Sequence, residues 1–252
     1  MKRRRARKRK VRAGRREPPP LALLLLLAIA SLAAVNFAYQ VIRKPTELLG
    51  LVAPTSPKLP EATWAEYGEL FEEHSTELVR PALLAALVQV ESAGDPLART
   101  YWRWRWSWNP LELYAPASSA VGILQITDGT LVEASRLCIH DHAVAHEGAW
   151  YDPRACWFNA LYFRTVPGHS IEMTAALLHE AIAEALAGRS ATAAQRHRVA
   201  ALVHLCGRGR APAFAQRGFR ALPGERCGAH DLENYLDRVE TLAQAFERLP
   251  AP

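Results

Sequence analysis

The first feature of the chain is a continuous apolar run over residues 21–42, whose polar members are Ser31, Asn36, Tyr39 and Gln40. At 1.5 Å per residue, a helix over this run would cross the hydrocarbon core of a bilayer, which takes about 20 residues. We therefore predict one N-terminal transmembrane helix that is retained as a signal anchor. A cleaved signal peptide is the alternative, although its apolar core is ordinarily shorter than this run.

Beyond residue 62, most apolar positions repeat with the period of an α-helix. One segment begins at Pro81 and continues to Ser92, where Gly94 and Pro96 end it. The remaining segments of helical period are an early one that carries Trp64, Tyr67, Phe71 and Leu78, and four later ones over residues 155–165, 171–187, 191–206 and 231–249. The sequence thus predicts a mainly α domain over residues 62–252.

Residues 101–108 read YWRWRWSW and break the helical pattern. Strict alternation of this kind is typical of a β-strand, and it places four of the seven tryptophans of the chain on one face. These are Trp102, Trp104, Trp106 and Trp108. We predict a short Trp-rich β-hairpin that packs its indoles on the helical core, because indoles bury a large area. A platform for sugar rings and a membrane-facing patch are the alternatives.

The net charge of +6 is concentrated at the N-terminus, where residues 1–16 hold 11 of the 31 Lys and Arg. Without them, residues 17–252 carry 20 basic and 25 acidic side chains, so nucleic acid is not an expected partner. By the positive-inside rule, residues 1–20 form a cytoplasmic tail. The rest of the chain is then exported, which predicts a single-pass membrane protein with its folded domain on the side of the membrane away from the cytoplasm.

Four prolines follow the apolar run, within residues 43–61. They are Pro45, Pro54, Pro57 and Pro60. Because this density disfavours helix, we expect a semi-rigid, extended linker that holds the folded domain off the membrane.

The four cysteines all fall on the exported side, where an even number favours disulfides. Four cysteines allow three pairings, and the shortest loops favour Cys138 with Cys156 and Cys206 with Cys227. His140, His142 and His146 lie close together but have no evident carboxylate or thiolate partners, so we expect a polar loop there and neither a metal nor another cofactor.

Glu91 is the candidate for chemistry. Leu84, Leu87, Val88 and Glu91 fall at i, i+3, i+4 and i+7, so Glu91 lies on the apolar face of its helix. A carboxylate that loses solvation in this way has a raised pKa and tends to stay protonated, as a general acid requires. The alternative is a structural Glu held by an arginine or a helix cap.

Several motifs resemble soluble lytic transglycosylases. In that family a catalytic Glu followed by Ser precedes a Gly-Leu-Met-Gln motif, and here Glu91 and Ser92, followed by Pro96 and Ala98, precede residues 118–127, which read SSAVGILQIT. Residues 233–236, which read ENYL, are similar to the family's Tyr-containing segment. The chain departs from the family at residues 203–209, VHLCGRG, where members usually have Ala-Tyr-Asn-Ala-Gly.

The resemblance implies a lysozyme-like fold and nonhydrolytic cleavage of the bond from N-acetylmuramic acid to N-acetylglucosamine in peptidoglycan, which leaves 1,6-anhydro ends. Glu91 would act first as acid and then as base, and peptidoglycan strands would be the partner. Ser118 and Gln125 would shape the cleft, and Tyr235 would lie near Glu91. The structural alternatives are a helix cap for Ser118, a helix amide for Gln125 and core packing for Tyr235.

Two other functions remain open at this point. A muramidase would hydrolyse the same bond with water, and most such glycosidases need a second carboxylate, for which Asp95, Glu112 and Asp128 are candidates. A noncatalytic peptidoglycan-binding protein of the envelope would need none.

Overall fold

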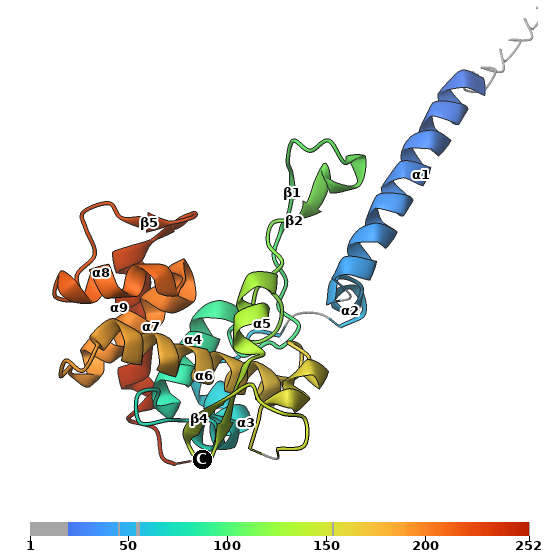
Figure 1. The fold of residues 1–252 in the computed structure, drawn as a ribbon. Helices are drawn as coiled ribbons and strands as arrows, with labels where there is room; N and C mark the ends of the chain where they lie inside the picture. Colours follow the sequence, from blue (N-terminus) through green and yellow to red (C-terminus); the bar gives the residue numbers. More distant parts are fainter. Residues whose placement is uncertain (1–19, 45, 54–55, 153, 252) are drawn as a thin grey trace, which may run out of the picture.

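The structure is a computed structural model that describes residues 20–44, 46–53, 56–152 and 154–251. The basic tail predicted at residues 1–20 lies outside this part, apart from Pro20. Helix α1 (Pro20–Arg43) extends away from a largely helical body (Figure 1). Its stretch Leu21–Arg43 is long and apolar enough to cross a membrane, and its apolar side chains from Leu21 to Val35 are largely exposed, whereas Gln40 near its end is buried.

The predicted linker contains a helix, α2 (Thr46–Val52), that contacts α1. The expectation of an extended spacer throughout residues 43–61 is therefore wrong for this segment. The physical reason is that the prolines of the linker flank residues 46–52 and none falls within them, so no residue there lacks the amide hydrogen that a helix needs.

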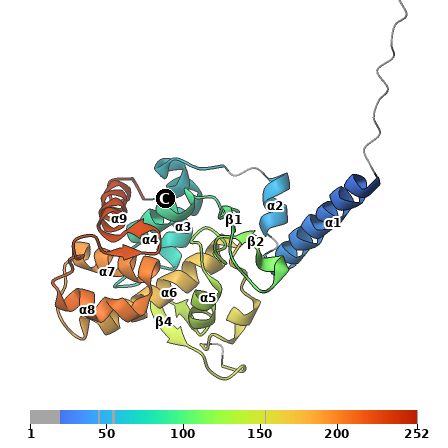
Figure 2. The ribbon, with the colours of Figure 1, turned by 90° about the horizontal axis from the view of Figure 1, so that it is seen from above.

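The body is built around α4 (Pro81–Ser92), which packs against α3 (Pro60–Glu73) and α9 (Leu232–Phe246). Every side chain from residue 83 to residue 88 is fully buried. Two further helices, α6 (Pro167–Leu186) and α7 (Ala193–Cys206), pack against each other, and α7 also packs on α9 (Figure 2). The prediction of a mainly α domain is confirmed.

Shorter elements connect these helices. Two of them are the helices α5 (Asp128–Ala134) and α8 (Ala211–Gln216), and three are the 3-10 turns η1 (Pro110–Glu112), η2 (Trp157–Leu161) and η3 (Arg208–Arg210). The strands form two-stranded antiparallel hairpins, namely β1 (Trp102–Trp104) with β2 (Tyr114–Pro116), β3 (Leu137–His140) with β4 (Ala143–His146), and β5 (Arg226–Cys227) with β6 (His230–Asp231).

Three local predictions were wrong. Residues 155–165 form only the short turn η2, because Leu161 and Phe163 stay exposed and give no buried helical face. The histidine-rich loop is the β3–β4 hairpin, in which His140 pairs with Ala143. Helix α3 ends at Glu73, so Leu78 lies beyond it.

The Trp-rich hairpin is present, but its strand is shorter than residues 101–108 and its register pairs Trp102 with Pro116 and Trp104 with Tyr114. The interpretation that its indoles pack on the helical core is wrong. Trp104, Trp106 and Trp108 are 76%, 92% and 97% exposed. The hairpin extends away from the body toward α1 (Figure 1), so these indoles have no core to pack on.

Both predicted disulfides are present, Cys138–Cys156 and Cys206–Cys227, each with its Cα atoms 5.4 Å apart. The first joins β3 to the start of η2. The second joins the end of α7 to β5 and so fixes the position of the hairpin that precedes α9 in the chain.

Removal of either disulfide should destabilise the protein. The bonds span 18 and 21 residues, and in the chain-entropy model a closed loop of this size contributes about 3 kcal/mol to the free energy of unfolding. Urea unfolding of the double variants Cys138→Ser with Cys156→Ser, and Cys206→Ser with Cys227→Ser, measures this. Alkylation of the unreduced wild-type protein is the control and should modify no thiol, whereas four reactive thiols would contradict both pairings.

Candidate active site

Glu91 lies in the last turn of α4, at the end of the buried stripe predicted for this helix. Leu84, Leu87 and Val88 are fully buried, whereas 19% of the surface of the Glu91 side chain is exposed. The helix ends directly afterwards, because Ala93 adopts a left-handed conformation with φ of 50°. The helix is therefore buried up to Glu91, and solvent or a ligand can still reach the Glu91 carboxylate.

Tyr235 is the closest partner of this carboxylate. It lies on the buried face of α9, and its hydroxyl donates a hydrogen bond of 2.5 Å to Oε1 of Glu91. Burial and the Glu91 carboxylate raise the pKa of the Tyr235 hydroxyl well above its usual range, so the phenol keeps its proton at neutral pH. Oε2 of Glu91 accepts no hydrogen bond from any residue that the structure describes. One carboxylate oxygen is thus held, and the other is available to a ligand.

The second motif of the predicted site is tied to the first by Ser92. Its hydroxyl donates a hydrogen bond of 2.7 Å to the carbonyl oxygen of Ile123, within the turn that carries Gly122 and Gln125. The turn is closed by an isolated bridge between Val121 and Ile126. The end of α4 and this turn therefore form one unit, although they are about 30 residues apart in the sequence.

Gly122 has a conformation that only glycine readily adopts, with φ of 85°. A Cβ atom at this position would lie 1.8 Å from the carbonyl oxygen of Arg164, so the turn and the Arg164 backbone are in direct contact. The turn also carries Gln125. Its side-chain nitrogen Nε2 donates hydrogen bonds to the carbonyl oxygens of Ala98 and Gly122, at 3.1 and 2.9 Å. The Gln125 side chain is therefore fixed in one orientation.

Gln125 lines a cleft of about 110 Å³ together with His204. Nε2 of His204 lies 3.5 Å from Oε1 of Glu91, so His204 connects the cleft to the carboxylate. Thr174, whose buried hydroxyl has no hydrogen-bond partner in the described part of the chain, and Glu133 also line the cleft. Glu91 and Tyr235 are not among the residues that line the cleft, so His204 is the link between its polar groups and the carboxylate.

His204 is a site residue that sequence reasoning missed. It occupies the last turn of α7, within the stretch at residues 203–209 that departs from the resembled family. That departure was the one feature of the sequence that could have pointed to His204. A single polar residue in an apolar helical stretch does not otherwise indicate a site.

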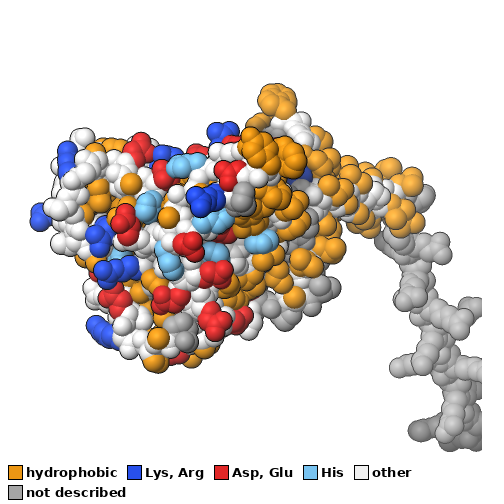
Figure 3. All heavy atoms as spheres, turned by 60° about the horizontal axis from the view of Figure 1, so that its bottom comes forward, with side chains coloured by type: hydrophobic (Ala, Val, Ile, Leu, Met, Phe, Trp, Pro, Cys, Tyr) orange, Lys and Arg blue, Asp and Glu red, His pale blue; other side chains and the backbone are white. Residues whose placement is uncertain are grey.

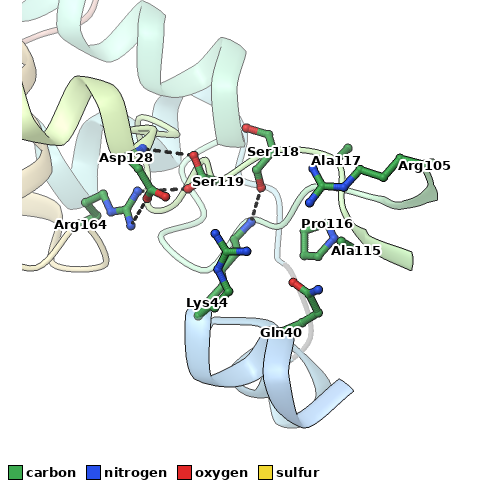
Figure 4. A pocket seen from close by; sticks show the side chains of 11 residues that line it. Gln40, Lys44, Arg105, Ala115, Pro116, Ala117, Ser118, Ser119, Asp128 and Arg164 are labelled. Carbon is green, nitrogen blue, oxygen red and sulfur yellow. Dashed lines mark hydrogen bonds and ion pairs between the residues drawn. The ribbon is translucent and has the colours of Figure 1, made fainter. Parts of the chain in front are cut away.

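Ser118 lies in a different pocket, of about 270 Å³, at the end of α1 (Figure 4). Its hydroxyl accepts a hydrogen bond from the amide of Ala120, and its carbonyl oxygen lies 3.4 Å from Nζ of Lys44. The residues that line this pocket include neither Glu91 nor Gln125. The structure thus brings Glu91, Tyr235 and His204 together, places Gln125 in the cleft that His204 also lines, and leaves Ser118 apart.

The three candidates for a second carboxylate are engaged elsewhere. Asp95 is buried and accepts a hydrogen bond from the amide of Leu97, as in a tight turn. Glu112 forms ion pairs with Arg43 and Arg105 beside α1. Asp128 is the first residue of α5 and pairs with Arg164 at 2.9 Å. Glu133, which sequence reasoning did not consider, is the carboxylate that lines the cleft.

Comparison of the chain with protein-family models, with curated proteins and with solved structures found no match.

Proposed function

We propose that the protein is a peptidoglycan lytic transglycosylase with a lysozyme-like fold, in which Glu91 is the single catalytic acid and base. The observation that carries this proposal is the hydrogen bond from Tyr235 to Glu91, which joins two of the motifs that resemble soluble lytic transglycosylases across 144 residues of sequence. The bond from Ser92 to Ile123 brings the third motif to the same place. Two of the motifs therefore meet at the Glu91 carboxylate, and the third is joined to the neighbouring Ser92.

The arrangement of the carboxylate suits both steps of such a reaction. In the first step, the proton on Oε2 of Glu91 passes to the glycosidic oxygen as its bond to C1 of N-acetylmuramic acid breaks. In the second step, the same oxygen takes the proton of the C6 hydroxyl, whose oxygen forms the new bond to C1. The product is a 1,6-anhydro ring, and Glu91 ends with the proton that it lost. Tyr235 holds Oε1 throughout and so keeps Oε2 directed toward the ligand.

The surroundings of the site also suit a glycan. The cleft that His204 connects to Glu91 offers the fixed side-chain amide of Gln125 and the imidazole of His204. Sugar hydroxyl and acetamido groups can form hydrogen bonds with each of these. An imidazolium at His204 would also stabilise the glutamate carboxylate that exists between the two steps.

The location that we propose is the periplasmic face of a bacterial inner membrane. The apolar helix α1 would cross the membrane once, with the basic tail in the cytoplasm. The two disulfides agree with this placement, because such bonds persist in oxidising compartments.

A hydrolytic muramidase is the second candidate, because Glu133 gives the cleft a further carboxylate that could activate water. Mass spectrometry of the muropeptides that the full-length protein releases from peptidoglycan separates the two reactions. We expect 1,6-anhydro ends from both the wild type and Glu133→Gln. Reducing ends that disappear in Glu133→Gln would instead identify a muramidase, and intact glycan with retained binding would identify a noncatalytic binding protein.

A further inference from the structure

The exposed tryptophans of the hairpin are a surface that catalysis does not explain. Trp106 and Trp108, at the turn of the hairpin, are more than nine-tenths exposed, and Trp104 is three-quarters exposed. Contiguous apolar surface of this kind on a soluble body marks a contact with another molecule or with a membrane. The question is therefore what covers these three indoles.

The hairpin is fixed to the end of α1. The ring of Trp102 stacks on Phe37 with centroids 6.1 Å apart, and the indole nitrogen of Trp102 donates a hydrogen bond of 2.8 Å to Glu47 of α2. From η1, Glu112 pairs with Arg43 at 3.0 Å. These contacts join the hairpin to both helices of the N-terminal segment, and Figures 1 and 2 show β1 and β2 beside the C-terminal end of α1.

The same contacts fix the depth of the hairpin in the bilayer that α1 would cross. The hydrocarbon core takes up about 20 helical residues, so a span that starts at Leu21 leaves it near Gln40. Asn36 and Gln40 both donate hydrogen bonds to the carbonyl oxygen of Leu111, at 2.8 and 2.6 Å. A side-chain amide at this depth needs such a partner, because the hydrocarbon offers none. The hairpin therefore meets α1 at the boundary between acyl chains and headgroups.

Indole side chains are enriched at this boundary of the membrane, since their rings are apolar and their N–H group is polar. Arg103 and Arg105 alternate with the tryptophans and are exposed. At the root of the hairpin, the pocket shown in Figure 4 is lined by Arg43, Lys44, Arg105 and Arg164, with Asp128 as its acidic member. Each of these pocket cations pairs with a carboxylate, Arg43 and Arg105 with Glu112, Lys44 with Glu47, and Arg164 with Asp128. The hairpin thus offers indoles to the acyl boundary and one exposed cation, Arg103, that is in no ion pair within the described part of the chain.

The wider surface agrees with this orientation. Figure 3 shows hydrophobic side chains gathered on the side of the body from which α1 extends, and charged side chains on the side away from it. A body that rested against a membrane on its α1 side would present this distribution.

We propose that the hairpin at residues 101–116 inserts Trp104, Trp106 and Trp108 into the headgroup region of the leaflet at the C-terminal end of α1, with Arg103 on anionic headgroups. The occupant of this surface is the lipid bilayer. The folded domain is then docked on the membrane at a fixed height, and the cleft beside Glu91 acts on glycan strands that lie close to that membrane. The inference requires α1 to span the bilayer but does not require Glu91 to be catalytic.

Tryptophan fluorescence of the full chain in lipid nanodiscs tests this. The discs contain phosphatidylcholine with a minority of phosphatidylglycerol, and parallel discs carry bromine on the upper acyl chains, where it quenches nearby indoles. The apolar run at residues 21–42 contains no tryptophan, so α1 adds no signal of its own. We expect brominated lipid to quench the wild type, and the quenching to fall to the contribution of Trp102, which stacks on Phe37 of α1, when Trp104, Trp106 and Trp108 are all changed to Ser. Trp150→Ser is the matched control, because Trp150 is 78% exposed on the loop after β4, and it should keep the quenching.

Three results would overturn the proposal. The first is a wild type, inserted in the discs, that brominated lipid does not quench, which needs no variant and so no assumption about folding. The second is quenching in the triple variant that equals that of the wild type, with the helix content of the variant checked by circular dichroism. The third is a change of the hairpin emission on addition of soluble peptidoglycan fragments without any effect of brominated lipid, which would identify a platform for sugar rings.

Discussion

Glu91→Gln should abolish glycan cleavage and leave the fold intact. An amide can neither give a proton to the glycosidic oxygen nor take one from the C6 hydroxyl, so both proposed steps fail together. General acid and general base steps each contribute typically ~10²- to 10⁴-fold, so the residual rate should lie near background. The hydrogen bond from Tyr235 can persist, because the carbonyl oxygen of Gln can replace Oε1 of Glu91 as its acceptor. We therefore expect the free energy of unfolding to change by no more than about 1 kcal/mol.

The measurement is the release of muropeptides from peptidoglycan, with thermal unfolding of the same sample. Glu77→Gln is the matched control, because Glu77 is an exposed carboxylate in the loop before α4, and it should cleave like the wild type. A folded Glu91→Gln protein that still releases anhydromuropeptides at the wild-type rate would exclude Glu91 as the catalyst and direct attention to Glu133.

The sequence predicts best the elements whose ends are marked by nearby residues such as proline, glycine or an N-cap. The bounds of α4 agree with the prediction, because Pro81 pre-sets the first turn and Gly94 follows the left-handed residue that ends the helix. The stripe that contains Tyr235 and Leu236 predicts α9 in the same way, with Asp231 as its N-cap. Both disulfides follow from loop length alone.

The parts that the sequence does not predict depend on long-range contacts. Residues 155–165 have the composition of a helix, but the disulfide from Cys156 to Cys138 fixes their N-terminal end, and the backbone there forms only the turn η2. The tryptophans of the hairpin satisfy the pattern of a half-buried strand, yet Trp102 packs on the end of α1, about 65 residues earlier, and the other three stay exposed. Alternation identifies the strand and its two faces, but it does not specify which surface covers them.

In the candidate site, too, local patterns predict some residues, and long-range packing brings in the others. Periodicity alone places Glu91 on an apolar face, and Tyr235 enters only through the resemblance, because no local pattern links residues 144 positions apart. His204 and Glu133 join the cleft through the packing of α7 and α5 around the turn at Gln125. Their roles depend on which side chains the tertiary structure brings together, and no single helix contains that information.

One added carbon atom should lower the free energy of unfolding most at the turn that carries Gly122 and Gln125. Gly122→Ala places a Cβ atom 1.8 Å from the carbonyl oxygen of Arg164, a backbone atom that cannot rotate away as a side chain would. The positive φ at this position adds strain of roughly 1 to 3 kcal/mol for a residue with a side chain. Because the clash comes on top of the strain, we expect the free energy of unfolding to fall by at least about 3 kcal/mol, and the midpoint of thermal unfolding to fall by on the order of 10 °C.

The same change should impair the site even below the unfolding temperature, since the turn holds Gln125 in the cleft and receives the hydrogen bond from Ser92 at Ile123. Gly129→Ala is the matched control. Gly129 lies in the first turn of α5, a Cβ atom there meets nothing within 4 Å, and alanine favours the helix by up to about 1 kcal/mol. Thermal unfolding of both variants, followed by cleavage assays at low temperature, measures the two effects separately. If Gly122→Ala unfolds at the wild-type temperature, the backbone at Arg164 can move without cost, and the contact that ties the turn to the rest of the domain is not a source of its stability.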